Sequence, residues 1–197
     1  MAMKLDISKV YDWVKWHFLK GIMLRLGLLE VWIDRVMTCV TTPTFSVCIN
    51  GKAYGNITPS RGIRQGDPLS PYLFLLCVER FSSLLAKAKG EGQIHGVSIC
   101  KRAPSISHLL FANDPLLFCR ANQEEVQAIS EVLRTYAACS GQCINFEKSF
   151  VYFSSNTRVN KRRGLRQFWE LKRLTGLNPI LGYLFWWVDQ NTKHLPI

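Results

Sequence analysis

The spacing of apolar residues along the first half of the chain predicts three helices. Apolar positions recur every three or four residues over 10–26, where a glycine ends the pattern, and again over 29–40. A third helix is expected to begin at Ser70-Pro71, a cap followed by proline in the first turn, and to run to Gly90. Each of these segments can bury one apolar face.

Shorter apolar runs predict strands. The runs TFSVCIN and KAYGNI are joined by an Asn-Gly pair, which is the strongest short-range hairpin signal in the chain. Further strands are expected around Leu5 and in IHGVSIC, SISHLLF, PLLFCR and KSFVYFS. Asn122 and Glu125 resemble a capping box that opens a fourth helix, which Gly141 ends. The pattern as a whole predicts an α+β fold, a small antiparallel sheet backed by helices.

Composition and charge narrow the possible partners. At 197 residues and 48% hydrophobic, the chain can bury one sizeable core. Its formal net charge of +11, from 25 basic and 14 acidic residues, favours a polyanionic partner. Residues 158–173 hold seven basic residues and one acidic residue, so +6 of this charge is concentrated there. A solvated basic helix and a nucleic-acid contact surface explain that segment equally well.

Cysteine usage and hydropathy indicate a reducing, non-membrane environment. The seven cysteines include no C-x-x-C pair, and no histidine lies near the closest two, Cys139 and Cys143. This pattern disfavours a zinc site and a disulfide framework. The opening MAMKLDISK lacks the apolar core of a signal peptide, and the longest apolar runs fall far short of the ~20 residues that span a bilayer. We therefore expect an intracellular chain that does not cross a membrane.

The segment SHLLFANDPLLF, residues 107–118, is the first candidate for chemistry. Its centre, Asn113-Asp114, lies between two apolar runs and predicts a tight hairpin whose turn residues tolerate left-handed backbone angles. A carboxylate held at such a tip can be presented to Mg²⁺, which prefers oxygen ligands. By itself the pattern favours an ordinary turn over a metal site.

Four segments together carry a resemblance that none carries alone. They are KLDISKVYD at 4–12, SRGIRQGDPLSPYLF at 60–74, FAND at 111–114 and SGQCINFEKS at 140–149. In this order and spacing, the first three resemble motifs A, B and C of reverse transcriptases, and the closest likeness is to the LINE-type, non-LTR retrotransposons abundant in plant genomes. The last resembles the fourth motif of that family, and RLTGLNPILGY at 173–183 is a weak echo of its thumb-proximal segment. The likeness covers residues 1–157 well and 158–197 poorly.

The resemblance implies the palm of an RNA-directed DNA polymerase, in which three aspartates hold two Mg²⁺ ions. Asp6 is the motif A match, and the backbone carbonyl of Ile7 would supply a further ligand. Asp114 matches the second motif C aspartate, whereas Asn113 replaces the first. An amide oxygen brings no negative charge, and loss of one fixed stabilising group commonly costs ~10²–10³ in rate. We therefore expect the site to be inactive as it stands.

The resemblance also implies residues that meet the nucleotide. Tyr11 matches the aromatic residue that packs under the incoming sugar and selects dNTP over NTP. Gln65 and Gly66 match the loop that lines the nucleotide and template, where Gly66 would permit a close backbone approach. Lys148 matches the lysine proposed to protonate the pyrophosphate leaving group. Without the resemblance, a core tyrosine and a solvated lysine explain Tyr11 and Lys148 as well.

Several charged residues are candidates for nucleic-acid contacts. Arg61 and Arg64 lie where phosphates would pass, although solvated loop arginines are the simpler explanation. Asp67 is expected to hold the loop rather than to bind metal. Within the basic segment, Arg162 and Arg163 are the candidate contacts.

These observations predict a palm-like domain over 1–157 and a basic, eroded thumb-proximal tail over 158–197, with fingers and thumb largely missing. The expected partners are an RNA template, a DNA primer and dNTP, with Mg²⁺ as cofactor. Two other interpretations stay open: a nucleic-acid-binding remnant without catalysis, and an unstable pseudogene product.

Overall fold

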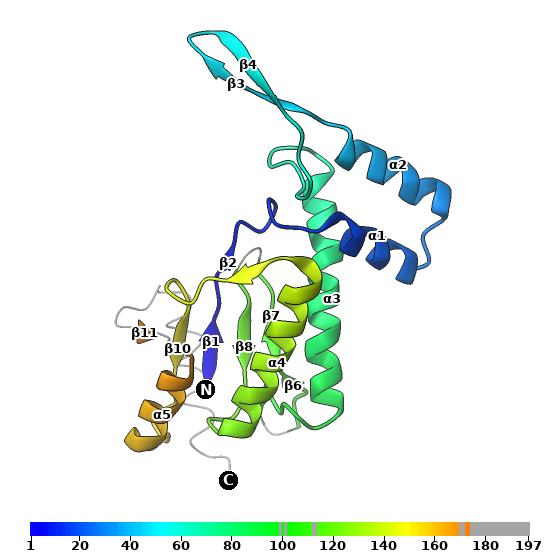
Figure 1. The fold of residues 1–197 in the computed structure, drawn as a ribbon. Helices are drawn as coiled ribbons and strands as arrows, with labels where there is room; N and C mark the ends of the chain where they lie inside the picture. The colour runs from blue at the N-terminus through cyan, green and yellow to red at the C-terminus, as the bar shows by residue number, and fades with distance from the viewer. Residues whose placement is uncertain (99, 101, 112–113, 170–171, 174–197) are drawn as a thin grey trace. The chain divides into compact units, whose positions relative to one another are not determined.

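The computed structural model describes residues 1–98, 100, 102–111, 114–169 and 172–173. The chain divides into two compact units, coloured by residue number in Figure 1. Unit 1 comprises residues 1–8, 81–135 and 143–197, and unit 2 comprises residues 9–80 and 136–142. The eroded thumb-like segment predicted at 173–183 lies, apart from Arg173, outside the described residues.

Unit 1 is built on a five-stranded sheet of order β11-β10-β1-β8-β7. Its strands are Lys172–Arg173 (β11), Phe150–Tyr152 (β10), Ala2–Lys4 (β1), Leu116–Phe118 (β8) and His108–Leu109 (β7). Neighbouring strands are antiparallel except for β10 and β11, which are parallel. Two short antiparallel pairs extend this unit: β2 (Ile7–Ser8) with β9 (Cys143–Ile144), and β5 (Val97–Ser98) with β6 (Ser105–Ile106).

The central strands of this sheet are buried on both faces. On one face Met3 lies opposite Leu117 and Val151, and each is at most 4% exposed. On the other face Ala2 lies opposite Phe118, and both belong to one buried cluster. Burial on both faces explains why these strands are continuous apolar runs in the sequence rather than alternating patterns.

The helix α4 (Gln123–Ser140) begins at the predicted cap, and its residues up to 135 belong to unit 1. The Asn122 Oδ1 accepts a hydrogen bond from the Glu125 N–H at 2.9 Å, as expected of a cap. The Glu125 carboxylate is 3% exposed and accepts from the backbone N–H groups of His95 at 3.1 Å and Arg120 at 3.0 Å. The predicted capping box is therefore confirmed in its first half, while the glutamate ties two loops to the helix instead.

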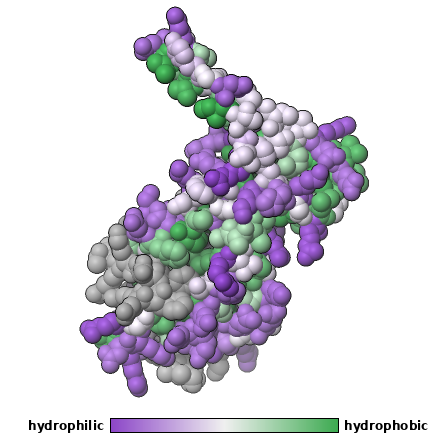
Figure 2. Space-filling model, in the orientation of Figure 1, coloured by the Kyte–Doolittle hydropathy of each residue, from purple (hydrophilic) through white to green (hydrophobic). Residues whose placement is uncertain are grey.

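Unit 2 holds α1 (Trp16–Arg25), α2 (Glu30–Thr41), the hairpin of β3 (Phe45–Ile49) and β4 (Lys52–Ile57), and the first part of α3 (Ser70–Gly90). The hairpin is confirmed at the predicted place, since Ile49 pairs with Lys52 and the two turn residues, Asn50 and Gly51, have φ of 49° and 77°. Figure 2 shows apolar residues on the surface of the hairpin and at the α1–α2 connection. They include Val47, Ile49, Tyr54, Leu29 and Trp32, all more than half exposed.

The helix predicted from residue 10 begins at Trp16 instead. Lys9 has a left-handed φ of 45°, which interrupts a helical path. Three carbonyl oxygens that would accept local bonds in a helix accept bonds from distant residues instead. The Val10 carbonyl accepts from the Gln142 side chain. The Tyr11 carbonyl accepts from the Ile63 N–H, and the Val14 carbonyl accepts from the Gly62 N–H. Asp12 therefore lies in a turn and not on a helix as predicted.

A buried polar network supports this turn. Tyr136, which is 2% exposed, donates its hydroxyl to the Gln142 Oε1. Gln142 is 1% exposed and donates its Nε2 to the Val10 carbonyl at 2.6 Å. Burial raises the pKa of Tyr136, so the hydroxyl keeps the proton that this bond needs.

The cysteines and the helices bear on the predicted environment. None of the seven cysteines, all of which the structure describes, forms a disulfide; Cys77 and Cys119 are buried, and burial raises the pKa of each to about 12. In the part of the chain that the structure describes, no helix is long and apolar enough to cross a membrane.

Candidate active site

Asp6 follows β1 and Asp114 precedes β8, so the two aspartates lie at the same edge of the sheet in unit 1. In the antiparallel pair of β1 and β8, Lys4 lies opposite Leu116, and the Leu5 N–H donates to the Pro115 carbonyl at 2.9 Å. The next residue outward on each strand is one of the two aspartates. The register of the sheet therefore brings the motif A and motif C carboxylates to neighbouring strand ends.

The segment that carries Asp114 is a hairpin, but a wider one than predicted. Leu109 of β7 pairs with Leu116 of β8, so the connection spans residues 110–115 and is not a two-residue turn. Within it the Asp114 N–H donates to the Phe111 carbonyl at 2.9 Å. Pro115 comes immediately before β8. Its carbonyl accepts the Leu5 N–H, but a proline has no N–H with which to return the second bond of this antiparallel pair. Asn113 lies outside the described residues.

A lysine that the sequence analysis did not select completes the charge at this edge. The Lys4 Nζ lies 2.8 Å from the Asp114 Oδ2, and the two side chains are 25% and 33% exposed. Lys4 and Asp6 are two residues apart on an extended segment, so both side chains leave the same face of the sheet. The sequence signal that could have identified Lys4 is its i, i+2 spacing from the candidate ligand Asp6.

The fourth-motif loop holds the backbone of Asp6 on both sides. The Asp6 N–H donates to the Ser149 Oγ at 3.0 Å, and the Asp6 carbonyl accepts from the Asn145 N–H at 2.8 Å. Ser149 is fully buried and donates its hydroxyl to the Asn145 carbonyl at 2.7 Å. Lys148 is exposed on this same loop, and the loop thereby brings it to the edge where Asp6 lies. The sequence analysis selected this segment but missed the positioning roles of Asn145 and Ser149.

The expected ligand Ile7 lies in β2, where it pairs with Ile144 and is 4% exposed. Its side chain thus anchors the segment after Asp6. Among the described residues, no cluster of three or more His, Cys, Asp or Glu side chains could hold a metal ion.

The motif B loop belongs to unit 2, and different constraints favour glycine at its positions 62 and 66. Gly62 has φ of +91°, and a Cβ there would lie 2.7 Å from the Asp12 carbonyl oxygen, so close packing excludes a side chain. Gly66 has φ of +86° and no protein atom within 4 Å of such a Cβ, so the backbone conformation of the turn favours glycine there. Its close approach to a nucleotide stays a prediction. Asp67 accepts the Leu69 N–H at 2.8 Å, which confirms its expected role in holding the loop.

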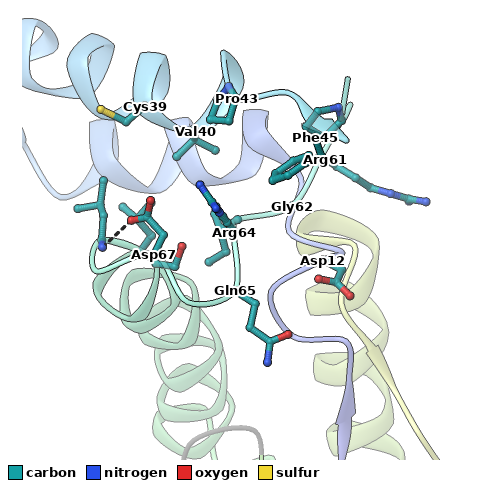
Figure 3. A pocket seen from close by; sticks show the side chains of 15 residues that line it. Asp12, Cys39, Val40, Pro43, Phe45, Arg61, Gly62, Arg64, Gln65 and Asp67 are labelled. Atoms are coloured by element: carbon teal, nitrogen blue, oxygen red, sulfur yellow. Dashed lines mark hydrogen bonds between the residues drawn. The ribbon is translucent and has the colours of Figure 1, made fainter. Parts of the chain in front are cut away.

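A cavity of about 380 Å³ lies in unit 2, between α2, the base of the hairpin and the motif B loop (Figure 3). Its polar lining residues include Asp12, Arg61, Arg64, Gln65 and Asp67. The Arg61 guanidinium carbon lies 4.2 Å from the centre of the Trp13 ring, and that of Arg64 lies 5.8 Å from the Phe45 ring. In Figure 3 the Arg61 side chain extends away from the other lining residues. Both arginines therefore stack on aromatic faces while their N–H groups stay available.

Tyr11 is half-buried, and its ring centre lies 5.4 Å from that of Phe74, tilted by 36°. This packing is compatible with a core tyrosine and with a ring that supports a ligand. Tyr11, Arg61, Arg64, Gln65 and Gly66 thus belong to unit 2, whereas Asp6, Ile7, Asp114 and Lys148 belong to unit 1.

The two candidate arginines of the basic segment lie on α5 (Val159–Trp169) of unit 1. Arg163 is exposed. The Arg162 guanidinium donates to the carbonyl oxygens of Ser154 at 3.0 Å, Ser155 at 2.9 Å and Thr157 at 2.6 Å. Arg162 therefore shapes the turn before α5.

Comparison with known proteins identifies the family. Residues 1–174 match the family model described as reverse transcriptase (RNA-dependent DNA polymerase). An uncharacterized mitochondrial protein of Arabidopsis thaliana is 54% identical over 66 residues, which are 34% of this chain and 54% of that protein. A retrovirus-related Pol polyprotein from the type-1 retrotransposable element R2 of Popillia japonica is 26% identical over 149 residues, covering 75% of this chain and 23% of the polyprotein. A 149 kDa protein of transposon TX1 from Xenopus laevis is 25% identical over 158 residues, covering 80% of this chain and 12% of that protein.

Among solved structures, the fold is similar to that of apo telomerase from Candida Tropicalis, with a TM-score of 0.59 at 14% identity, over 80% of this chain and 31% of the telomerase chain. This likeness concerns the fold alone. The chain spans about half of the Arabidopsis protein and less than a quarter of the R2 polyprotein. The predicted α+β fold and the predicted resemblance to non-LTR retrotransposon proteins are both confirmed. The chain belongs to the reverse transcriptase (RNA-dependent DNA polymerase) family.

Proposed function

We propose that unit 1 carries the catalytic edge of an RNA-directed DNA polymerase palm, and that this edge is catalytically impaired by Asn113. The observation that carries the proposal is the bond from the Leu5 N–H to the Pro115 carbonyl, 2.9 Å, which fixes Asp6 and Asp114 at neighbouring strand ends. Its partners would be an RNA template, a DNA primer and dNTP.

The carboxylate oxygens of Asp6 and Asp114 fit one divalent cation of the Mg²⁺ class, but they bring too little negative charge to hold two such ions. Carboxylate oxygens are the ligands that Mg²⁺ prefers. Two ions ~3.5–4 Å apart would bring four positive charges, against which Asp6 and Asp114 bring two negative ones. The amide of Asn113 adds none, and the ammonium of Lys4 at 2.8 Å from Asp114 removes one. A bound ion would polarise the phosphoryl group and favour the ionised primer hydroxyl.

The chain's own residues would position the Asp6 carboxylate and protonate the departing pyrophosphate. Asn145 and Ser149 fix the backbone of Asp6, so that its carboxylate is presented at one place. Lys148, exposed on the same loop, would give a proton to the departing pyrophosphate. In unit 2 the cavity lined by Arg64 and Gln65 supports a role in holding phosphate and base.

The test compares the unmodified chain with Asp6→Asn and Asn113→Asp. Manganese binding is followed by electron paramagnetic resonance, and primer extension on an RNA template is followed with Mg²⁺ and with Mn²⁺. We expect Asn113→Asp to tighten Mn²⁺ binding and to raise extension only in part, and the unmodified chain to extend no faster than Asp6→Asn. Efficient extension by the unmodified chain that Asp6→Asn abolishes would contradict the proposed impairment. Manganese affinity that neither variant changes would contradict the metal site.

A second function, nucleic-acid binding without catalysis, is favoured by the exposed basic residues of α5 and of the residue that precedes it. Arg158, Lys161 and Arg163 are all exposed, and the formal charge of the chain is +11. Such binding should weaken steeply with salt, because each neutralised phosphate releases a counterion.

A further inference from the structure

A second hollow lies in unit 1 at the end of the sheet remote from Asp6 and Asp114. It has a volume of about 890 Å³ and is lined by residues 1, 120–122, 154 and 156–161. We call it the α5 groove. Figure 1 shows the beginnings of β1 and α4 and the helix α5 at this end of the unit. Asp6 lies five residue steps beyond Met1 along β1 and its extension, a span of roughly 16 Å at ~3.3 Å per residue.

The lining of the α5 groove is basic and contains no carboxylate. Its charged side chains are Arg120, Arg158 and Lys161, and all three residues are exposed. Outside the lining, the Glu125 Oε1 lies 3.9 Å from the Arg120 Nε. Glu125 is 3% exposed and already accepts two backbone N–H groups and the ring of His95, whereas the Arg120 side chain is 63% exposed. The groove therefore presents three cations to solvent above one buried, engaged carboxylate.

One wall of the groove is preformed. The three bonds from Arg162 to the carbonyls of Ser154, Ser155 and Thr157 close the turn before α5. The Asn156 N–H donates to the Ser154 Oγ at 3.3 Å and tightens the same turn. Arg162 thus holds the wall. The cationic side chains left to meet a ligand are Arg158 just before the helix, Lys161 on the helix and Arg120 before α4.

We propose that the α5 groove binds the sugar–phosphate backbone of a nucleic-acid strand, at a distance from the reacting end. The proposal rests on the proposed polymerase function for the identity of the polyanion. The groove has the chemistry of a phosphate contact, since its lining combines three cationic side chains with the amide donors of Asn156 and Asn160. A protein partner would need an apolar centre, and of the large apolar side chains of the groove only Val159 is mainly exposed, at 69%.

The experiment uses the full chain and a fluorescently labelled 20-nucleotide single-stranded RNA, with the dissociation constant measured by anisotropy from 50 to 200 mM NaCl. The test variant is Arg120→Gln with Arg158→Gln and Lys161→Gln. The matched control, Lys20→Gln with Arg35→Gln and Lys87→Gln, removes the same charge from exposed positions outside the groove. Circular dichroism melting establishes that both variants fold.

We expect the groove variant to bind at least tenfold more weakly at 100 mM NaCl, and the control less than threefold. Loss of three phosphate contacts should also reduce the slope of log K against log salt by about 2–3. Equal loss in the two variants, or none in the groove variant, would overturn the groove while leaving the polymerase proposal intact. Manganese binding by a chain that binds no RNA would likewise overturn the groove and leave the polymerase proposal intact. A chain that binds neither manganese nor RNA would overturn the polymerase proposal too. Displacement of the RNA by polyglutamate of equal charge as readily as by unlabelled RNA would overturn the nucleic-acid assignment.

Discussion

The ion pair between Lys4 and Asp114 predicts that removing the lysine charge strengthens divalent-cation binding. In the Lys4→Met variant the side chain keeps its length and its packing along the strand but loses the ammonium that lies 2.8 Å from the Asp114 Oδ2. The carboxylate then faces solvent without a competing cation. Because the pair is 25% and 33% exposed, its own contribution to folding stability should be small, at most about 1 kcal/mol.

The size of the effect lies between two limits. A bound Mg²⁺ would lie ~2.1 Å from a carboxylate oxygen, and if it shared Oδ2 with the ammonium at 2.8 Å the two cations would be about 5 Å apart. At that separation and an effective dielectric constant of about 20, they repel by roughly 7 kcal/mol. That value is a ceiling, because a partly exposed lysine can rotate away, and breaking the exposed pair costs only ~0.2–1 kcal/mol. Some repulsion remains after the lysine rotates away. We therefore expect Lys4→Met to bind the divalent cation with a dissociation constant about three- to tenfold lower than that of the unmodified chain, or roughly 0.6–1.4 kcal/mol.

The assay is Mn²⁺ titration followed by electron paramagnetic resonance at low salt, for the unmodified chain, Lys4→Met, and Lys4→Met combined with Asp114→Asn. Lys87→Met is the matched control, because it removes one exposed lysine charge elsewhere in unit 1. The double variant should lose the gain. If Lys4→Met binds Mn²⁺ with the same affinity as the unmodified chain while the double variant binds it more weakly, the lysine does not compete with the ion and the reasoning fails.

Three further predictions concern the folded state. Tyr136→Phe leaves the side-chain oxygen of its buried glutamine partner without a donor, and should lower the free energy of unfolding by ~1–3 kcal/mol in urea; an unchanged midpoint would contradict the network. Gly62→Ala should destabilise by more than ~1 kcal/mol because its φ of +91° and the carbonyl 2.7 Å away both oppose a Cβ, whereas Gly21→Ala in α1, with no atom in reach, should raise the melting temperature. Since burial raises the pKa of Cys77 and Cys119 to about 12, few of these thiols are ionised at pH 8. The five exposed cysteines should react with a disulfide reagent in the native protein, and these two only after unfolding; seven fast thiols would contradict the burial.

Elements with strong local signals could be predicted from the sequence. The Asn50-Gly51 turn needs left-handed angles at both residues, and the pair itself reports that need. The start of α3 at Ser70 and the cap of α4 at Asn122 are likewise written in a few adjacent residues. In each case the interaction that fixes the element spans only two to four positions of sequence.

The elements that could not be predicted depend on distant residues. The late start of α1 results from bonds between residues 10–14 and residues 62, 63 and 142, and no local pattern records those partners. At the candidate site the two aspartates could be paired only through resemblance to a family, because the register of β1 against β8 is a property of the sheet. The role of Lys4 was missed for the same reason, since its partner lies 110 positions away in the chain.

The place of β1 in the sheet has a consequence for biosynthesis. This strand is synthesised well before both of its neighbours, β8 and β10, and the backbone of Asp6 is held by Asn145 and Ser149. At ~5–20 residues per second, roughly 7–30 s separate the synthesis of β1 from that of β10. Until β8 is made, the nascent strand has apolar side chains on both faces and two unpaired edges, and until β10 is made one edge stays unpaired. Assembly of the edge that carries Asp6 therefore depends on contacts of high sequence separation, and the waiting strand is a natural substrate for chaperones.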